Sequence, residues 1–293
     1  MIRRFLSLIA LLIACAAPLA ALDPAWTTPE PPFRIAGNLY YVGSQDLASY
    51  LIATPQGLIL INSNLASSPA QIRASVRKLG FHWSDIKILL ISHAHYDHCA
   101  GSAQILRETH AKYEVMAQDV SVVQSGGRTD FNYGADKTMR FPPAHVDRAL
   151  YDGDKVTLGG VTLTAHLTAG HTRGTTTWTF DEQEGGRTLH VVIVGSPNVN
   201  PGYKLVGNRV YPQIARDYAH EFDVLEHLPC DIFLGAHGGY FDLDTKYAHF
   251  QHGDKDAFID PAGYKAYVAD RRAAFEAELA RQSHPQGKPN PGL

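Results

Sequence analysis

Residues 86–98 of this 293-residue chain read IKILLISHAHYDH, and this stretch decides the fold. The run Ile86–Ile91 is apolar at every position except Lys87, which predicts a buried strand. Residues 92–98 follow it as the loop at the exit of the strand. Four potential metal ligands therefore fall within six residues, directly after a buried strand.

The four residues in question are His93, His95, Asp97 and His98. In an extended chain His93 and His95 point to the same side, because side chains alternate, so both imidazoles can bind one cation. Asp97 and His98 lie in the following turn, where they can face a second cation. Imidazole and carboxylate ligands suit zinc, whereas a calcium site would use oxygen ligands instead.

Two further histidines occupy similar positions. His171 follows the predicted strand that ends at Thr168, and His237 follows the one that ends at Leu234; both are flanked by glycine. Glycine lets the backbone come close to a metal. Three loops that carry ligands at strand ends can build one site along the edge of a sheet. We interpret the remaining histidines as surface or core residues.

Strands and helices are predicted in two similar halves. The first half is expected to hold strands at 33–38, 39–42, 49–53, 57–61, 86–91 and 113–117, with helices at 68–80 and 100–109. The second is expected to hold strands at 155–158, 161–168, 175–181, 189–194 and 230–234, with helices at 212–227 and from Pro261 onward. Two mixed sheets, each covered by helices on one face, pack into a four-layer αββα sandwich of the α/β class, with the metal site at the sheet edge.

Composition bounds the class of protein. Hydrophobic residues make up 45% of the chain and charged residues 19%, the balance of a folded globular protein. The formal net charge of -3 gives no basic excess for binding nucleic acid or an anionic membrane. With 3 cysteines there is no disulfide framework, and we expect Cys99 and Cys230 to stay unpaired. Residues 22–283 are predicted to form a single domain, and residues 284–293 a disordered tail.

The N-terminus has the features of an export signal. Arg3 and Arg4 precede an apolar run from Phe5 to Ala17 and a small-residue end, which predicts a signal peptide over residues 1–21 and a periplasmic protein. The run is too short for a membrane span. A second interpretation stays open, because the residues up to Cys15 resemble a lipoprotein signal in which Cys15 would carry a lipid anchor.

The stretch His93–His98 resembles the signature of the metallo-β-lactamase fold, and His171 and His237 match the later ligand motifs of that family in order and spacing. The resemblance covers roughly residues 33–280. Glyoxalase II and the RNA-processing members usually carry an aspartate after the strand that here ends at Val194, and no aspartate stands there. The sequence is therefore most similar to the β-lactamases of class B, subclass three.

That resemblance implies two zinc ions per chain and a set of ligands. The first zinc would take His93, His95 and His171, and the second would take Asp97, His98 and His237. The implied activity is hydrolysis of the β-lactam amide bond of penicillins, cephalosporins and carbapenems by a metal-bound hydroxide, which gives antibiotic resistance. Asp97 would both bind metal and orient the nucleophile, as the catalytic residue. We expect a monomer whose partner is the small-molecule β-lactam.

The sequence departs from the family pattern at two places. Asn62 stands where an aspartate usually supports the metal site, and Pro197 and Val199 stand where a serine pair commonly lies near the substrate carboxylate. Asn62 keeps a hydrogen-bonding amide but loses the charge, and such a change beside a metal site can cost about 10- to 100-fold. We expect Pro197 and Val199 to affect substrate affinity and spectrum rather than the zinc chemistry. The residues that could take over substrate binding are Asn198, Asn200 and Tyr203.

Other interpretations remain open. Another exported hydrolase of the same fold, a lactonase or thioesterase, is the main alternative, and a non-catalytic periplasmic zinc-binding protein is a second. The long segment 124–147, with Phe131 and Tyr133, is either a wall of the substrate pocket or a solvated connection.

Overall fold

The structure is a computed structural model that describes residues 22–284. The predicted signal peptide, Cys15 and the tail beyond His284 lie outside the described residues. The strands are β1 (Phe33–Ala36), β2 (Leu39–Tyr41), β3 (Tyr50–Thr54), β4 (Gly57–Ile61), β5 (Ile86–Leu90), β6 (Lys112–Met116), β7 (Arg148–Leu150), β8 (Lys155–Leu158), β9 (Val161–Leu167), β10 (Thr176–Glu184), β11 (Arg187–Val194) and β12 (Ile232–Gly235). The α-helices are α1 (Ser68–Lys78), α2 (Tyr96–Cys99), α3 (Ser102–Thr109), α4 (Ala117–Ser125), α5 (Ile214–His227), α6 (Leu243–Gln251) and α7 (Pro261–Ser283).

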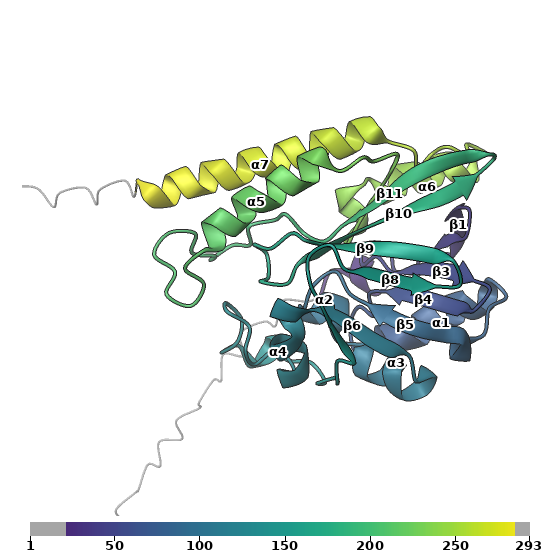
Figure 1. Cartoon of the computed structure of the whole chain (residues 1–293), viewed down its shortest axis with the longest axis horizontal. Coiled ribbons are helices and arrows are strands. Elements are labelled where there is room, and N and C mark those ends of the chain that lie inside the picture. Colours follow the sequence, from purple (N-terminus) through teal and green to yellow (C-terminus); the bar gives the residue numbers. More distant parts are fainter. Residues whose placement is uncertain (1–21, 285–293) are drawn as a thin grey trace, which may run out of the picture.

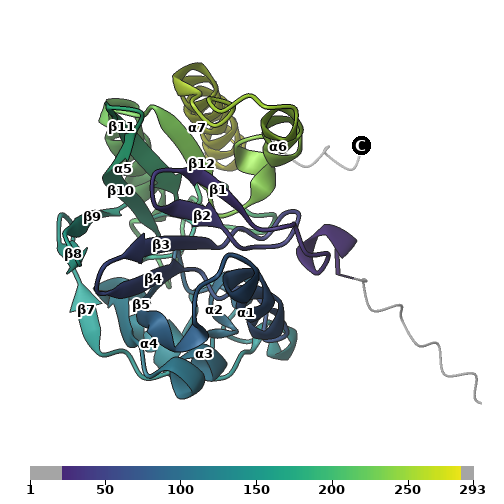
Figure 2. The ribbon, with the colours of Figure 1, turned by 90° about the vertical axis from the view of Figure 1, so that its right-hand side faces the viewer.

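These strands form two sheets. The seven-stranded sheet runs in the order β1-β2-β3-β4-β5-β6-β7, and the five-stranded sheet in the order β12-β11-β10-β9-β8. Helices α1, α3 and α4 lie on the outer side of the first sheet, and α5 and α7 lie on the outer side of the second (Figures 1 and 2). The predicted four-layer αββα sandwich is therefore confirmed.

Short elements are where the sequence prediction was wrong. Helix α2 turns within the predicted exit loop, and β7 and α6 were not predicted. Helix α4 was not predicted either: it begins at the last residue of the strand predicted at 113–117 and ends two residues into the predicted long loop 124–147. Each of these elements is short, so its sequence contains too few apolar residues at regular spacing to be distinguished from a loop.

The direction of the strands determines which loops meet at the predicted metal site. β4, β5 and β6 are parallel neighbours, so their carboxyl ends meet at one edge of the first sheet. β11 and β12 are likewise parallel and end together at Val194 and Gly235. The buried Trp178 of β10 donates its indole N–H to the carbonyl of Ile91 at 3.0 Å, which joins the two halves of the fold two residues before His93. The loops after β5, β9 and β12 therefore converge on one edge of the sandwich.

The cysteine prediction is confirmed. Cys99 is buried, Cys230 is half-buried, and both are free thiols in the described part of the chain. Among the helices of residues 22–284, none has the length and apolar character that crossing a membrane requires.

Helix α5 carries a buried acid that makes stability depend on pH. Glu221 is fully buried, and neither of its carboxyl oxygens has a hydrogen-bond partner among residues 22–284. Burial raises the pKa of Glu221 well above its usual range. Below the unfolded-state pKa both states are protonated, whereas above it only the unfolded state ionises readily, so this group lowers stability as pH rises.

We therefore expect Glu221→Gln to be no more stable than the parent at pH 4 and progressively more stable towards pH 7. The gain should grow by about 1.4 kcal/mol per pH unit until the folded-state pKa is reached. Urea denaturation at several pH values measures it, and Glu226→Gln, at an exposed position of the same helix, is the control. A stability difference between Glu221→Gln and the parent that does not change with pH would contradict the argument.

Candidate metal centre

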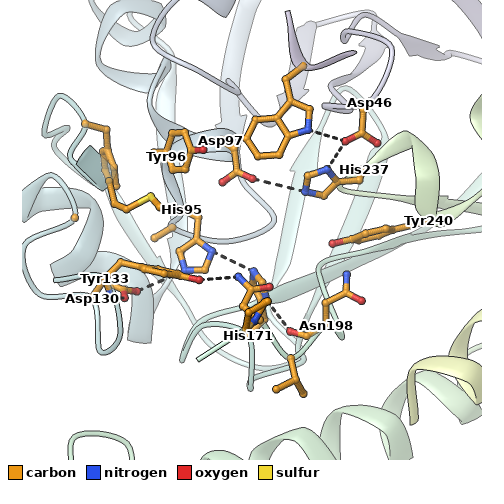
Figure 3. A pocket seen from close by; sticks show the side chains of 18 of the residues that line it. Asp46, His95, Tyr96, Asp97, Asp130, Tyr133, His171, Asn198, His237 and Tyr240 are labelled. Atoms are coloured by element: carbon orange, nitrogen blue, oxygen red, sulfur yellow. Dashed lines mark hydrogen bonds and ion pairs between the residues drawn. The ribbon is translucent and has the colours of Figure 1, made fainter. Parts of the chain in front are cut away.

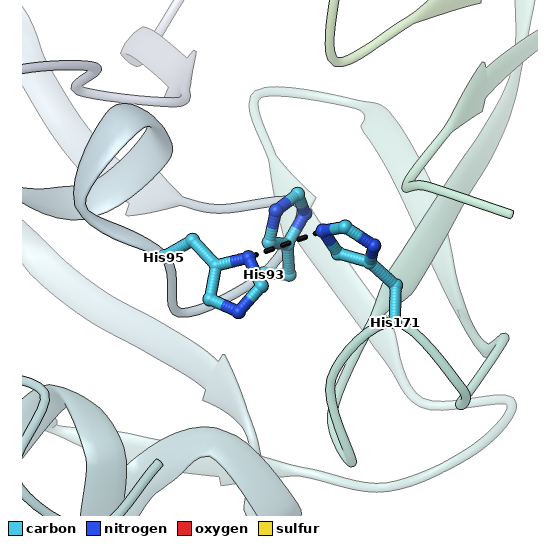
Figure 4. A group of neighbouring side chains, drawn as sticks. All are labelled: His93, His95 and His171. Atoms are coloured by element: carbon cyan, nitrogen blue, oxygen red, sulfur yellow. Dashed lines mark hydrogen bonds between the residues drawn. The ribbon is translucent and has the colours of Figure 1, made fainter. Parts of the chain in front are cut away.

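The first cluster of ligand atoms consists of His93, His95 and His171, whose nitrogen atoms lie within 4.8 Å of one another. Nδ1 of His95 and Nε2 of His171 are 3.1 Å apart, and all three rings are buried (Figure 4). Nε2 of His93 is buried without a hydrogen-bond partner among the described residues. An unpaired buried nitrogen is costly unless something binds its lone pair, so this cluster fits a metal ion.

A second cluster adjoins the first and consists of Asp97, His98 and His237. Nε2 of His98 lies 3.3 Å from Oδ2 of Asp97 and 3.2 Å from Nε2 of His237, and Nε2 of His237 lies 3.6 Å from that same carboxylate oxygen. Figure 3 shows Asp97 and His237 pointing toward one another across the cavity from the two halves of the fold. The ligand atoms of His93, Asp97 and His98 also lie within 4.8 Å of one another. His93 of the first cluster is therefore adjacent to two residues of the second cluster.

The pKa shifts of His93, His171 and Asp97 suit metal binding, whereas for His95 the contact with Asp130 outweighs burial and raises the pKa. Burial and the neighbouring imidazoles lower the pKa of His93 well below its usual value and lower the pKa of His171 to about 3. Burial alone would raise the pKa of Asp97, but His98 and His237 lower it far below the usual range. Neutral imidazoles and an ionised carboxylate are the forms that coordinate divalent transition metals.

Two of the candidate ligands are oriented by a hydrogen bond from the ring nitrogen that faces away from the clusters. Nδ1 of His171 donates to the main-chain carbonyl of Asn198 at 2.8 Å, and Nδ1 of His237 donates to Oδ2 of Asp46 at 2.8 Å. A carbonyl and a carboxylate can only accept a hydrogen bond, so the proton of each imidazole is on Nδ1. The lone pair of Nε2 therefore faces the cluster. Asp46 also accepts from the indole N–H of Trp26 at 3.0 Å and was not singled out from the sequence.

Asp119 is a second residue that the sequence analysis missed. It is buried, and its two oxygens accept hydrogen bonds from Ala94 N (2.8 Å), Thr172 Oγ1 (2.8 Å) and Gly174 N (2.9 Å). These donors come from the loop that carries His93 and from the loop that carries His171. One carboxylate thus fixes the two loops relative to each other.

Asn62 keeps the supporting role expected of its amide. Its Oδ1 accepts from the main-chain N–H of Ser92 at 2.8 Å, and its Nδ2 donates to the carbonyl of Ala48. Its φ of 67° is in the left-handed region, which asparagine tolerates better than most residues. The amide therefore holds the end of β5 in place, one residue before His93, without contacting a ligand ring.

The two clusters open into a cavity of about 600 Å³. Asp97, His171 and His237 line it, together with Asn198 and Asn200. Tyr203, the third predicted substrate contact, does not reach it: the side chain is buried and donates its hydroxyl to the carbonyl of His171 at 2.9 Å.

The segment 124–147 forms one wall of this cavity. Asp130, Tyr133 and Phe141 contribute to the lining, and Oδ2 of Asp130 lies 3.6 Å from Nε2 of His95. Phe131 packs instead against the rings of Tyr203 and Tyr211. Of the two interpretations of this segment, the structure favours the pocket wall.

Comparison with known proteins identifies the family. Residues 47–237 match the model of the metallo-beta-lactamase superfamily. The native FEZ-1 metallo-beta-lactamase from Legionella gormanii is 56% identical, with a TM-score of 0.87 over 89% of this chain and 98% of that chain. BJP-1, a subclass B3 metallo-beta-lactamase of Bradyrhizobium japonicum, is 35% identical, with a TM-score of 0.84 over 90% of this chain and 99% of that chain. The class B3 di-zinc metallo-beta-lactamase LRA-12 from an Alaskan soil metagenome is 36% identical, with a TM-score of 0.85 over 89% and 98%. The chain belongs to the metallo-β-lactamase superfamily and, within it, to subclass B3.

Proposed function

We propose that this protein is a zinc-dependent hydrolase that opens the amide bond of β-lactam antibiotics and so confers resistance to them. The observation that carries the proposal is the pair of adjoining ligand clusters at the base of one cavity. Relatives that are 35% to 56% identical over about nine-tenths of the chain bear the name metallo-beta-lactamase, which supports the same assignment.

The proposal assigns one zinc ion to His93, His95 and His171 and a second to Asp97, His98 and His237. The di-zinc relative supports this stoichiometry. The unpaired Nε2 of His93 and the inward Nε2 atoms of His171 and His237 fit such a donor set. Zinc ions held there would supply the Lewis acidity that polarises a carbonyl group and activates water.

The side chains around the clusters perform the remaining tasks. Asp97 is ionised, so it can accept a hydrogen bond from the attacking water and orient it. Asp46 and the carbonyl of Asn198 keep two imidazoles in their binding orientation. Asn200 donates its amide to the hydroxyl of Tyr133 at 3.0 Å, so the wall that faces the substrate is fixed before binding.

The proposal includes export. A signal peptide over residues 1–21 would deliver residues 22–283 to the periplasm as a single-domain monomer, with lipidation of Cys15 as the alternative. The mass of the mature protein distinguishes cleavage after the signal from a lipid anchor.

The test is a chelator-controlled panel of one penicillin, one chromogenic cephalosporin and one carbapenem. We expect hydrolysis of at least one of them, loss of activity by more than about 100-fold after chelation, and recovery when zinc is added back. A lactone and a thioester in the same panel test the alternative hydrolases. Turnover of either one without turnover of any β-lactam would refute the proposal.

A further inference from the structure

The cavity has an uneven distribution of charge. Three carboxylates line it: Asp46, Asp97 and Asp130. Of the lining residues in the described part of the chain, Arg271 is the only one that carries a permanent positive charge. Under the proposed function Asp97 would be neutralised by a zinc ion, and Arg271 would then be the one permanent cation that the lining residues themselves offer to an anionic group on the ligand.

Arg271 is held at a fixed place relative to the metal clusters. It projects from α7, and its Nη1 donates to Oδ1 of Asn198 at 3.2 Å. The main-chain oxygen of the same Asn198 accepts from Nδ1 of His171 at 2.8 Å and from the hydroxyl of Tyr218 at 2.7 Å. One residue therefore links the guanidinium to a ligand of the first cluster.

The guanidinium remains available to a ligand. Its side chain is 35% exposed, and its acidic neighbour is Asp270, which is adjacent in sequence and 66% exposed. An ion pair between exposed side chains contributes little, so an incoming carboxylate can compete for the same donors. The planar guanidinium offers several N–H donors: Nη1 donates to Asn198, and Nε and Nη2 donate to the exposed Asp270, so a substrate carboxylate would take the place of Asp270.

The nearby segment offers few other donors for an anion. Pro197 has no main-chain N–H, and Val199 has no polar side chain. One of the two N–H donors of the Asn200 side-chain amide already donates to the hydroxyl of Tyr133. The positive group on this side of the cavity is thus supplied from α7 and not from the segment itself.

We propose that Arg271 is a specificity-determining residue that binds the carboxylate of the β-lactam substrate, with Asn198 as its positioning partner. This inference rests on the proposed function. Penicillins, cephalosporins and carbapenems all carry a carboxylate beside the lactam ring, and an arginine pairs with such a group through parallel N–H donors. The consequence is a preference for acidic β-lactams over neutral esters of the same ring system.

The experiment compares a cephalosporin with its methyl ester on the zinc-loaded enzyme. In Arg271→Met we expect kcat/KM for the acid to fall by about 10- to 100-fold, mainly through KM, and kcat/KM for the ester to change less than about threefold. Arg271→Lys keeps the charge and should recover part of the loss. The KM of the parent for the acid should rise with salt concentration, and that of Arg271→Met should rise much less.

Arg272 provides a matched control, since it is the next residue of the same helix and its side chain is 32% exposed. It pairs with Asp223, Glu226 and Glu276 and does not line the cavity. Arg272→Met should leave the ratio of acid to ester unchanged.

The outcomes separate the two proposals. If the parent hydrolyses no β-lactam, the proposed function fails. If the parent is active but acid and ester fall together in Arg271→Met, Arg271 has only a structural role and the inference is overturned. An unchanged acid-to-ester ratio with full activity overturns it as well.

Discussion

Replacing Asp97 by alanine is expected to lower kcat/KM for a β-lactam by at least about 1,000-fold, which corresponds to about 4 kcal/mol of transition-state stabilisation. The Asp97 carboxylate contacts Nε2 of both His98 and His237, and it is the only acid in the second cluster. Under the proposed function its loss removes one of the three donors assigned to the second zinc ion and the group that would orient water. We therefore expect zinc content to fall toward one ion per chain.

The fold should survive this change. The Asp97 side chain faces the cavity and not the core, so truncation creates no packing defect. Asp97→Asn keeps the shape without the charge and should lose nearly as much activity. Asp244→Asn, at an exposed position in α6, is the matched control. Zinc analysis, circular dichroism and steady-state kinetics measure the three effects. Near-parental rates at normal zinc content would refute the role of Asp97.

The ligand clusters could be predicted because their signal is local. His93, His95, Asp97 and His98 lie within six residues after a run that is apolar except for Lys87. Side chains alternate along an extended chain, so the spacing of His93 and His95 already places both imidazoles on one side. His171 and His237 follow apolar strands and are flanked by glycine. The parallel order of β4, β5 and β6, which brings the strand ends together, follows from alternation of strands and helices.

The residues that orient the ligands could not be predicted in the same way. Asp46 lies 191 residues from His237 in sequence, and nothing in its local context separates it from other aspartates in turns. Asp119 follows the strand predicted at 113–117, at the same edge as the ligands, so a weak signal existed. Its importance comes from partners 25 and 55 residues away.

Tyr203, in contrast, was predicted to contact the substrate and does not line the cavity. A polar aromatic residue in a loop near the site was a reasonable candidate for substrate binding. In the fold its hydroxyl donates to the carbonyl of His171, and its ring packs against that of Phe131, with 5.0 Å between the ring centroids. Whether a tyrosine faces a cavity or the interior depends on such tertiary partners, which the local sequence does not contain.

Replacing Asp119 by alanine is expected to destabilise the protein by about 3–9 kcal/mol and to lower activity by more than about 100-fold. Three donors, from Ala94, Thr172 and Gly174, would lose their acceptor in a buried site. Each unsatisfied buried group costs about 1–3 kcal/mol. Such a loss is a large part of the stability of a typical domain, about 5–15 kcal/mol.

Two further variants separate the three hydrogen bonds of Asp119. Asp119→Asn keeps one acceptor oxygen but turns an NH₂ group toward a donor, so it should be intermediate in both stability and activity. Thr172→Val removes one donor of the three and should lose the least. Urea denaturation gives the order of stability, and kcat/KM gives the order of activity. If Asp119→Ala unfolds at the same urea concentration as the parent, the carboxylate does not hold the two ligand loops together. Because those loops carry ligands of the first cluster, activity and stability should fall in the same order across the series, whereas in Asp97→Ala activity alone should fall.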